Sequence, residues 1–224
     1  MPALPNTSDC KPFDGQDADA LVSPMCSQWP CFDPPLRLAV MASGSGSNFE
    51  ALVEATKKEL QATVELLVVN NHGCGAQLRA QRLGVACEVV DHRGFNSRED
   101  LDAALVKRFQ DLGVEAVVMA GWMRIVTPVL IDAFTNRLIN IHPSLLPSFR
   151  GMDAIGQALA SGVTITGCSA HVVTADVDTG PVITQAAVPI HPNDDHAALS
   201  ARIHRQEHKI LPWAVAIKGK EWRR

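Results

Sequence analysis

Apolar and polar residues follow a regular rhythm from about residue 36 onward. Short apolar runs, typical of buried parallel strands, are separated by segments with helical periodicity. The pattern predicts strands over residues 37–42, 63–69, 86–90, 115–120 and 137–141, and helices over residues 49–60, 75–82, 97–112 and 128–134. Ser97 precedes the third of these helices as a candidate N-cap. Strands that alternate with helices indicate an α/β, Rossmann-like, mostly parallel sheet with right-handed crossovers and helices on both faces.

The rhythm changes after Arg150. A short helix is expected over residues 152–161, followed by two longer strands over residues 166–174 and 182–190. Because only a turn-rich segment connects these two strands, we expect them to pair in antiparallel fashion near the C-terminal part of the domain. A last helix is predicted to start near Asp194 and to continue past Pro212.

The first 35 residues have a different character. They contain seven of the fourteen prolines and five acidic residues but one basic residue, without sustained periodicity. They have neither the basic start and apolar run of a secretory signal nor the Arg-rich composition of a transit peptide. Residues 1–35 are therefore predicted to form a disordered extension, and residues 36–224 one catalytic domain.

Composition excludes several classes of function. Twenty basic and 24 acidic residues give a formal charge of −4 without a basic stripe, which argues against nucleic acid as a partner. The longest apolar runs are too short to span a membrane. None of the six cysteines forms a Cys-x-x-Cys pair, so we expect reduced thiols in a cytoplasmic protein.

The glycine- and serine-rich segment 43–48 joins the first predicted strand to the first helix. Glycines let the backbone turn sharply, and free N–H groups at a helix start can bind an anion. Phe49 stands where a dinucleotide fingerprint needs a third glycine, and no Gly-Lys-Ser/Thr follows, so a phosphomonoester is favoured over a nucleotide. The alternative is a tight turn in which Ser47 or Asn48 caps the helix.

Asn140 and His142 close a predicted parallel strand, where open α/β sheets bind ligands. Strand alternation puts both side chains on one face. An amide and an imidazole there could bind a carbonyl oxygen and stabilise it as an oxyanion. The alternative is a histidine that is satisfied by backbone groups.

Asp178 lies in a turn-rich acidic segment, 174–181, which by itself is typical of a solvated hairpin connection. In the functional interpretation its carboxylate lies beside His142 and favours the charged imidazolium. Near the C-terminus, His204, Glu207 and His208 form a His-x-x-Glu-His pattern on one helix face. Because a zinc hydrolase needs a further protein ligand, we expect no metal, and we expect this face to meet a polar substrate instead.

Taken together, the motifs resemble those of the phosphoribosylglycinamide formyltransferase family, the folate-dependent transformylases of purine synthesis. The resemblance spans Arg37 to Trp213 and rests on five segments in the family's order: residues 43–48, 120–125, 140–147, 178–183 and 206–208. It implies transfer of a formyl group from the cosubstrate 10-formyltetrahydrofolate to the amine of glycinamide ribonucleotide. It also implies a cytoplasmic enzyme that acts as a monomer or homodimer on small-molecule substrates.

The resemblance assigns roles by position. Asn140, His142 and Asp178 are implied to be catalytic. Gly46, Ser47, Asn48 and Glu207 are implied to bind the ribonucleotide. The implied folate-binding residues are Arg98, Met123, Arg124, Ile125, Val126 and Asn140.

Two other functions are alternatives at this stage. A 10-formyltetrahydrofolate hydrolase would use water as the acceptor, but residues 1–35 are too short and too polar for that enzyme's regulatory domain. A catalytically silent phosphate- or folate-binding module would need none of the three catalytic residue types, and all three are present.

Overall fold

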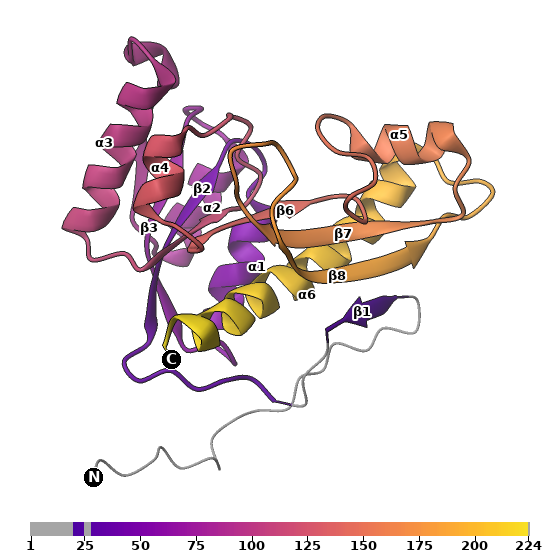
Figure 1. Cartoon of the computed structure of the whole chain (residues 1–224), viewed down its shortest axis with the longest axis horizontal. Helices are drawn as coiled ribbons and strands as arrows, with labels where there is room; N and C mark the ends of the chain where they lie inside the picture. The colour runs from indigo at the N-terminus through magenta and orange to yellow at the C-terminus, as the bar shows by residue number, and fades with distance from the viewer. Residues whose placement is uncertain (1–19, 25–27, 224) are drawn as a thin grey trace.

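The computed structural model describes residues 20–24 and 28–223 (Figure 1). In chain order its elements are β1 (Leu21–Ser23), β2 (Leu36–Ala42), α1 (Ser47–Thr56), β3 (Ala62–Val69), α2 (Gly75–Leu83), β4 (Cys87–Val89), the 3-10 turn η2 (His92–Gly94), α3 (Arg98–Asp111), β5 (Ala116–Met119), α4 (Pro128–Ala133), β6 (Leu138–His142), α5 (Ala154–Ser161), β7 (Ile165–Val172), β8 (Val182–Pro189) and α6 (His196–Trp222).

The strands form one eight-stranded sheet in the order β1-β8-β7-β6-β5-β2-β3-β4. The half from β4 to β6 is parallel, and the half from β6 to β1 is antiparallel. This arrangement confirms the predicted α/β class, the mostly parallel sheet and the antiparallel pair near the C-terminal part. Strand β6 therefore lies at the boundary between the two halves.

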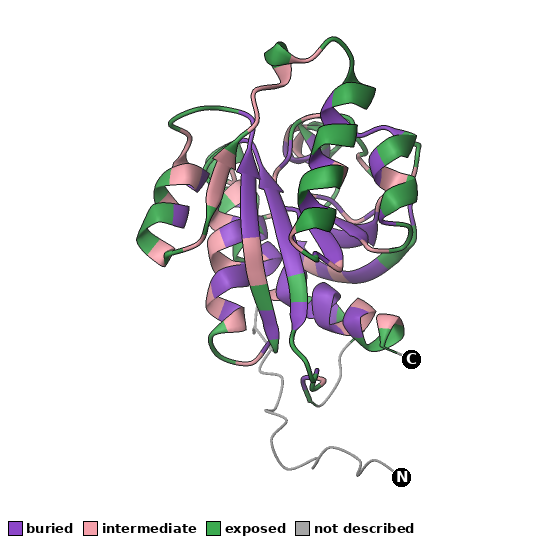
Figure 2. Ribbon diagram, turned by 90° about the vertical axis from the view of Figure 1, so that its left-hand side faces the viewer, coloured by how far each residue is buried: buried purple, intermediate pink, exposed green. Residues whose placement is uncertain are grey.

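Helices cover both faces of the sheet (Figure 1). Strand alternation divides the core between them: Leu38 and Val40 pack in the cluster that contains α1, α2 and α6, whereas Ala39 and Met41 pack with α3 and α4. Both sides of the central strands are thus removed from solvent, as the buried colour of these strands in Figure 2 shows. This explains why β2 and β5 read as continuous apolar runs in the sequence.

Helix ends follow local sequence signals. The hydroxyl of Ser97 accepts a hydrogen bond from the backbone N–H of Asp100, which confirms the predicted N-cap of α3. Helix α6 continues through Pro212 to Trp222, as expected. Over the residues that the structure describes, no helix is both long and apolar enough to cross a membrane.

The loops that follow the parallel strands meet at the carboxyl edge of the sheet. Ser43, just after β2, donates its backbone N–H to the carbonyl of Gly121, which follows β5, at 3.0 Å. Asn71, after β3, donates its side-chain amide to the carbonyl of Ser43 at 2.9 Å. The predicted phosphate loop and the segment 120–126 are therefore joined at this edge, close to the end of β6.

The prediction that residues 1–35 lack structure is wrong over residues 20–24 and 28–35. Strand β1 pairs with β8, and Trp29 and Phe32 are buried. The prediction rested on the proline-rich composition and gave no weight to the two aromatic rings, which supply apolar surface for packing. Trp29 packs edge-on against Trp213 of α6, with ring centroids 5.0 Å apart. Residues 1–19 and 25–27 lie outside the described part of the chain.

Candidate functional site

Asn140 and His142 lie at the carboxyl end of β6, and both side chains point away from the face that carries Ile139 and Ile141. The His142 side chain is buried, whereas Asn140 is half-buried. The predicted shared face is therefore present. The sequence alternation was sufficient for this prediction because β6 is a regular strand.

Asp178 comes to these two residues from the loop between β7 and β8. Its Oδ2 lies 3.3 Å from Nδ1 of His142, and its Oδ1 lies 3.5 Å from the amide nitrogen of Asn140. The backbone of Asp178 has a φ of 53°, a left-handed conformation that is uncommon for a residue other than glycine. The loop thus holds the carboxylate inward, and the three predicted catalytic residues form one cluster.

A fourth residue of this cluster, His171 on β7, was not identified from the sequence. Its Nε2 lies 3.4 Å from Oδ1 of Asp178 and 3.2 Å from the amide nitrogen of Asn140. Its Nδ1 lies 2.9 Å from the carbonyl oxygen of Val172, so this nitrogen carries a proton and donates it. A histidine inside an apolar strand is typical of a core residue, and the signal that could have revealed it is its place near the end of the strand that leads into the Asp178 segment.

Both ring nitrogens of His142 face hydrogen-bond acceptors. Nδ1 faces the carboxylate of Asp178, and Nε2 lies 2.8 Å from the carbonyl oxygen of Phe149. A neutral imidazole has one N–H, so only the doubly protonated ring can donate to both partners. A protonated His142 would therefore find an acceptor for each N–H, next to the amide of Asn140.

The carboxylate of Asp178 is held in its charged form. Burial by itself would raise the pKa of Asp178, but the hydrogen bonds from His171 and the Gly151 backbone and the charge of His142 together lower it below its ordinary value of 3.8. Asp178 is therefore ionised at neutral pH, and its carboxylate faces Nδ1 of His142.

The loop between β2 and α1 has the geometry expected of an anion site. Gly46 adopts a left-handed φ of 77°, and a Cβ at this position would lie 2.5 Å from Cα of Ala76. Helix α1 begins at Ser47 without a side-chain cap, so the alternative that Ser47 or Asn48 caps this helix is wrong. The first N–H groups of α1 are left available for a ligand.

Asn48 instead joins this loop to α6. Its side-chain amide donates to Oε2 of Glu207 at 2.8 Å, and both side chains are buried. The side-chain oxygen of Asn48 is buried without a hydrogen-bond partner, so it could accept a hydrogen bond from a bound ligand. Two predicted binding residues that are 159 positions apart in the sequence are thereby brought together.

Burial raises the pKa of Glu207, against the lowering effects of the Asn48 hydrogen bond and of His204 and His142. His204 lies on the same helix with its Nε2 3.9 Å from Oε2 of Glu207. Burial also disfavours the charged form of His208, and it therefore lowers the pKa of that imidazole below its ordinary value of 6.5. Among the described residues, no group of three or more His, Cys, Asp or Glu side chains is arranged to hold a metal ion.

Besides Asn140 on β6, the residues implied to bind folate lie in two places. Met123 and Ile125 are exposed on the loop after β5, Arg124 is half-buried, and Val126 is buried. The backbone N–H of Met123 donates to the hydroxyl of Ser43 at 2.9 Å, which ties this loop to the start of the phosphate loop. Arg98 is the exposed first residue of α3. Further along this helix, Asp102 accepts a hydrogen bond from the Thr127 backbone.

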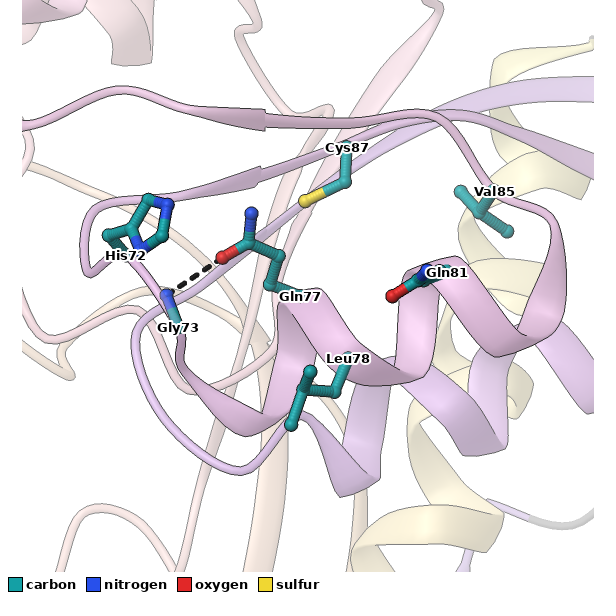
Figure 3. Close-up of a pocket in the computed structure, with 7 residues that line it drawn as sticks. All are labelled: His72, Gly73, Gln77, Leu78, Gln81, Val85 and Cys87. Atoms are coloured by element: carbon teal, nitrogen blue, oxygen red, sulfur yellow. Dashed lines mark hydrogen bonds between the residues drawn. The ribbon is translucent and has the colours of Figure 1, made fainter.

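A separate hollow of about 450 Å³ lies between α2 and β4 (Figure 3). Its lining residues are His72, Gly73, Gln77, Leu78, Gln81, Val85 and Cys87. None of them belongs to the cluster at the end of β6 or to the anion loop. We therefore locate the candidate site by its chemical groups and not by this hollow.

Comparison with known proteins identifies similar sequences and structures. The formyl transferase family profile matches residues 36–215. The chain is 37% identical to phosphoribosylglycinamide formyltransferase of Bacillus subtilis (strain 168), over 80% of this chain and 92% of that protein. The crystal structure of glycinamide ribonucleotide transformylase 1 from Symbiobacterium toebii has a TM-score of 0.80 at 41% identity, and the match covers 82% of this chain and 87% of that one.

The chain is also similar to a much longer protein. It is 38% identical to the human trifunctional purine biosynthetic protein adenosine-3 over 81% of this chain, but the match covers 18% of that protein. The match thus spans less than a fifth of the length of this trifunctional relative.

Proposed function

The chain belongs to the phosphoribosylglycinamide formyltransferase family, and from this premise we propose that it transfers a formyl group from 10-formyltetrahydrofolate to the primary amine of glycinamide ribonucleotide in purine biosynthesis. The observation that carries this proposal is the buried His142, with the Asp178 carboxylate on one ring nitrogen and a backbone carbonyl on the other. An imidazolium fixed beside an amide donor suits an acyl-type transfer, in which an oxyanion develops.

In the proposed reaction the amine nitrogen attacks the formyl carbon, and the carbonyl oxygen becomes an oxyanion. The amide of Asn140 donates a hydrogen bond to this oxygen, and the charge of His142 stabilises it. Collapse of the intermediate breaks the bond between the formyl carbon and the folate nitrogen. The proton from the amine passes by way of the His142–Asp178 pair, or an ordered water, to that leaving nitrogen, so charge and atoms balance.

We propose that the substrates occupy adjoining parts of the carboxyl edge. Gly46, Ser47 and Asn48 bind the ribonucleotide phosphate through free backbone N–H groups. Glu207 binds the ribose or glycinamide end, a role that its burial beside Asn48 supports. Binding both reactants in one site would supply much of the rate through orientation.

The folate is proposed to lie against the loop after β5. The residues assigned to it are Arg98, Met123, Arg124, Ile125, Val126 and Asn140. Met123 and Ile125 are 77% and 56% exposed, and such apolar side chains suit contact with a flat ring system. Arg98 would meet the anionic glutamate tail.

We propose that residues 36–224, onto whose sheet and core the segments 20–24 and 28–35 are packed, carry the catalytic groups, and that the protein works in the cytoplasm as a monomer or homodimer. The proposed chemistry needs no metal, because a protonated imidazole and an amide supply the charge stabilisation. The partners are small molecules, without nucleic acid or membrane.

The test is an assay of the purified full chain with glycinamide ribonucleotide and a 10-formylfolate, in which the deformylated folate is followed by absorbance. We expect turnover that requires the ribonucleotide and is abolished in His142→Ala. His191→Ala, which changes an exposed histidine before α6, is the matched control and should retain full activity. Deformylation without the ribonucleotide would indicate a hydrolase instead, and binding without turnover would indicate a silent module.

A further inference from the structure

The antiparallel half of the sheet places three polar residues in one row beside the proposed catalytic site. His142 of β6 is paired with Ser169 of β7, and Ser169 is paired with Gln185 of β8. Residues directly opposite each other in antiparallel strands point to the same face. Ser169 and Gln185 therefore extend the row of His142 away from the reacting groups.

Ser169 and Gln185 are joined by a hydrogen bond, and together they bind the segment that follows His142. We refer to this pair as the Ser169–Gln185 clamp. The amide nitrogen of Gln185 donates to the hydroxyl of Ser169 at 2.8 Å and to the carbonyl of Leu146 at 3.0 Å. The same hydroxyl accepts from the Leu146 backbone N–H at 3.0 Å and donates to the carbonyl of Ser144 at 2.7 Å.

The segment held in this way continues back to the imidazole. The hydroxyl of Ser144 donates to the carbonyl of Ser148 at 2.6 Å, and the Ser148 N–H donates to the carbonyl of Leu145 at 3.0 Å. The next residue is Phe149, whose carbonyl oxygen lies 2.8 Å from Nε2 of His142. An unbroken series of hydrogen bonds thus runs from Gln185 to the turn that ends on the ring of His142.

We propose that Gln185 is a positioning residue for the reaction: through Ser169 and the carbonyl of Leu146 it fixes the turn 143–149, which presents the Phe149 carbonyl to Nε2 of His142. This inference rests on the proposed function for its kinetic consequence. Its structural part, the orientation of the imidazole, does not depend on the identity of the substrates.

Both donated bonds of Gln185 come from one amide nitrogen, and Ser169 and Ser144 are fully buried. Loss of that amide would leave the Leu146 carbonyl without this donor and free the turn to shift. Three other charged or titratable groups surround His142. Asp178 contacts its Nδ1, His171 contacts the far oxygen of that carboxylate, and Glu207 interacts electrostatically with the His142 ring. None of these is touched by the substitution.

The test compares Gln185→Met with Thr184→Val. Methionine approximates the length of glutamine but lacks both N–H donors. Thr184 is the preceding residue of β8, is fully buried, and donates its hydroxyl to the Ser23 carbonyl at 3.1 Å on the opposite face. Thr184→Val removes a hydrogen bond from the same strand without touching the turn, which makes it the matched control.

In the unliganded proteins we expect the ¹⁵N resonance of His142 Nε2 to move in Gln185→Met and to remain unchanged in Thr184→Val. We expect kcat to fall by about 10- to 100-fold in Gln185→Met, with both KM values little changed, because a displaced reacting group loses orientation.

An unchanged His142 resonance in a folded Gln185→Met protein would overturn the proposal, as would a kcat equal to that of Thr184→Val. Ser169→Ala is the second variant, to be used if Gln185→Met does not fold. It should produce the same change in the His142 resonance. If the wild-type chain lacks transferase activity, the proposed function fails, whereas the resonance comparison still decides the role of Gln185.

Discussion

At the scale of single residues, the candidate site consists of buried and half-buried groups that each have a partner on another element. Asn140 and His142 come from β6, Asp178 from the loop before β8, and His171 from β7. The amide of Asn140 lies within 3.5 Å of both Asp178 and His171. The chemistry is therefore set by contacts among strands and not by any single motif.

Replacement of Asn140 by alanine is expected to remove one oxyanion donor. Such a loss typically raises the barrier by about 2.7–4 kcal/mol, so kcat should fall by about 100-fold or more while KM for the ribonucleotide changes little. Steady-state kinetics would measure this effect, with Asn193→Ala, an exposed asparagine before α6, as the control. A kcat within about threefold of the wild type would remove Asn140 from the proposed mechanism.

The pH dependence of stability tests the environment of Glu207. Its pKa is raised above the ordinary value of 4.5, mainly by burial, so the folded state holds this proton more tightly than the unfolded chain does. This contribution to stability is present below pH 4.5 and is lost as the pH rises through the raised pKa. Glu207→Gln should therefore become progressively more stable relative to the wild type over that range.

Denaturant unfolding at a series of pH values would measure this difference. Glu99→Gln, at an exposed position of α3, is the control and should show no such trend. A Glu207→Gln protein whose relative stability is constant with pH would show that the carboxyl group does not titrate differently in the folded state.

Residue types and strand alternation were sufficient to nominate Asn140 and His142 together. For Asp178 the sequence offered the contact with His142 as one of two interpretations, and the family resemblance favoured it. The contact between Asn48 and Glu207 could not be predicted from spacing, because α1 and α6 meet through tertiary packing. His171 was missed for a related reason: its role depends on the strand that lies beside it and not on its own neighbours in sequence.

At the scale of the elements, the β2–α1 loop illustrates how backbone conformation makes a binding surface. Gly46 is required both by its left-handed φ and by its approach to Ala76 of α2, whereas a Cβ on Gly44 would have no atom within 4 Å. The two glycines of the same loop therefore have different importance. Of these two glycines, Gly46 is the one whose missing Cβ allows α2 to pack against the start of α1.

Gly46→Ala is expected to strain the backbone by about 1–3 kcal/mol and to displace the loop. KM for the ribonucleotide should rise several-fold, while KM for the formyl donor should change less. Gly44→Ala is the matched control, with nearly unchanged constants. Equal effects of the two substitutions on ribonucleotide binding would contradict the assigned role of Gly46.

Most elements were predicted within a few residues of their ends, because central strands such as β2 and β5 are almost entirely buried and the helices have regular apolar faces. Strand β1 was not predicted. It has three residues, Leu21 to Ser23, beside a proline, and so short a segment shows no period. Its structure depends on the edge of β8, which lies more than 160 positions further along the chain.

At the scale of the whole molecule, residues 28–36 connect the edge strand to the core. The indole N–H of Trp213 donates to the carbonyl of Pro24 at 3.1 Å, and Trp29 packs on the same indole. Phe32 and Leu36 leave no room for a Cβ on Gly219 of α6. The segment thus packs along the same helix that carries Glu207 toward the site.

Trp29→Ala should lower the free energy of unfolding by about 3–5 kcal/mol, the range typical of a buried tryptophan. Thermal and denaturant unfolding would measure it. Leu21→Ala is the control, because this side chain is 73% exposed, and its effect should stay within about 0.5 kcal/mol. Similar small effects of both substitutions would mean that the Trp29 contact adds little to the fold.

Strand β1 also covers backbone groups of β8 at Gln185, Ala186 and Ala187. If β1 were detached, these N–H and C=O groups would form an open edge onto which a second molecule could add its own strand. The extent of self-association after loss of the N-terminal segment would then depend on protein concentration. A truncated chain would form larger particles in light scattering as the solution is made more concentrated, even where a dilute sample still showed a normal circular dichroism spectrum.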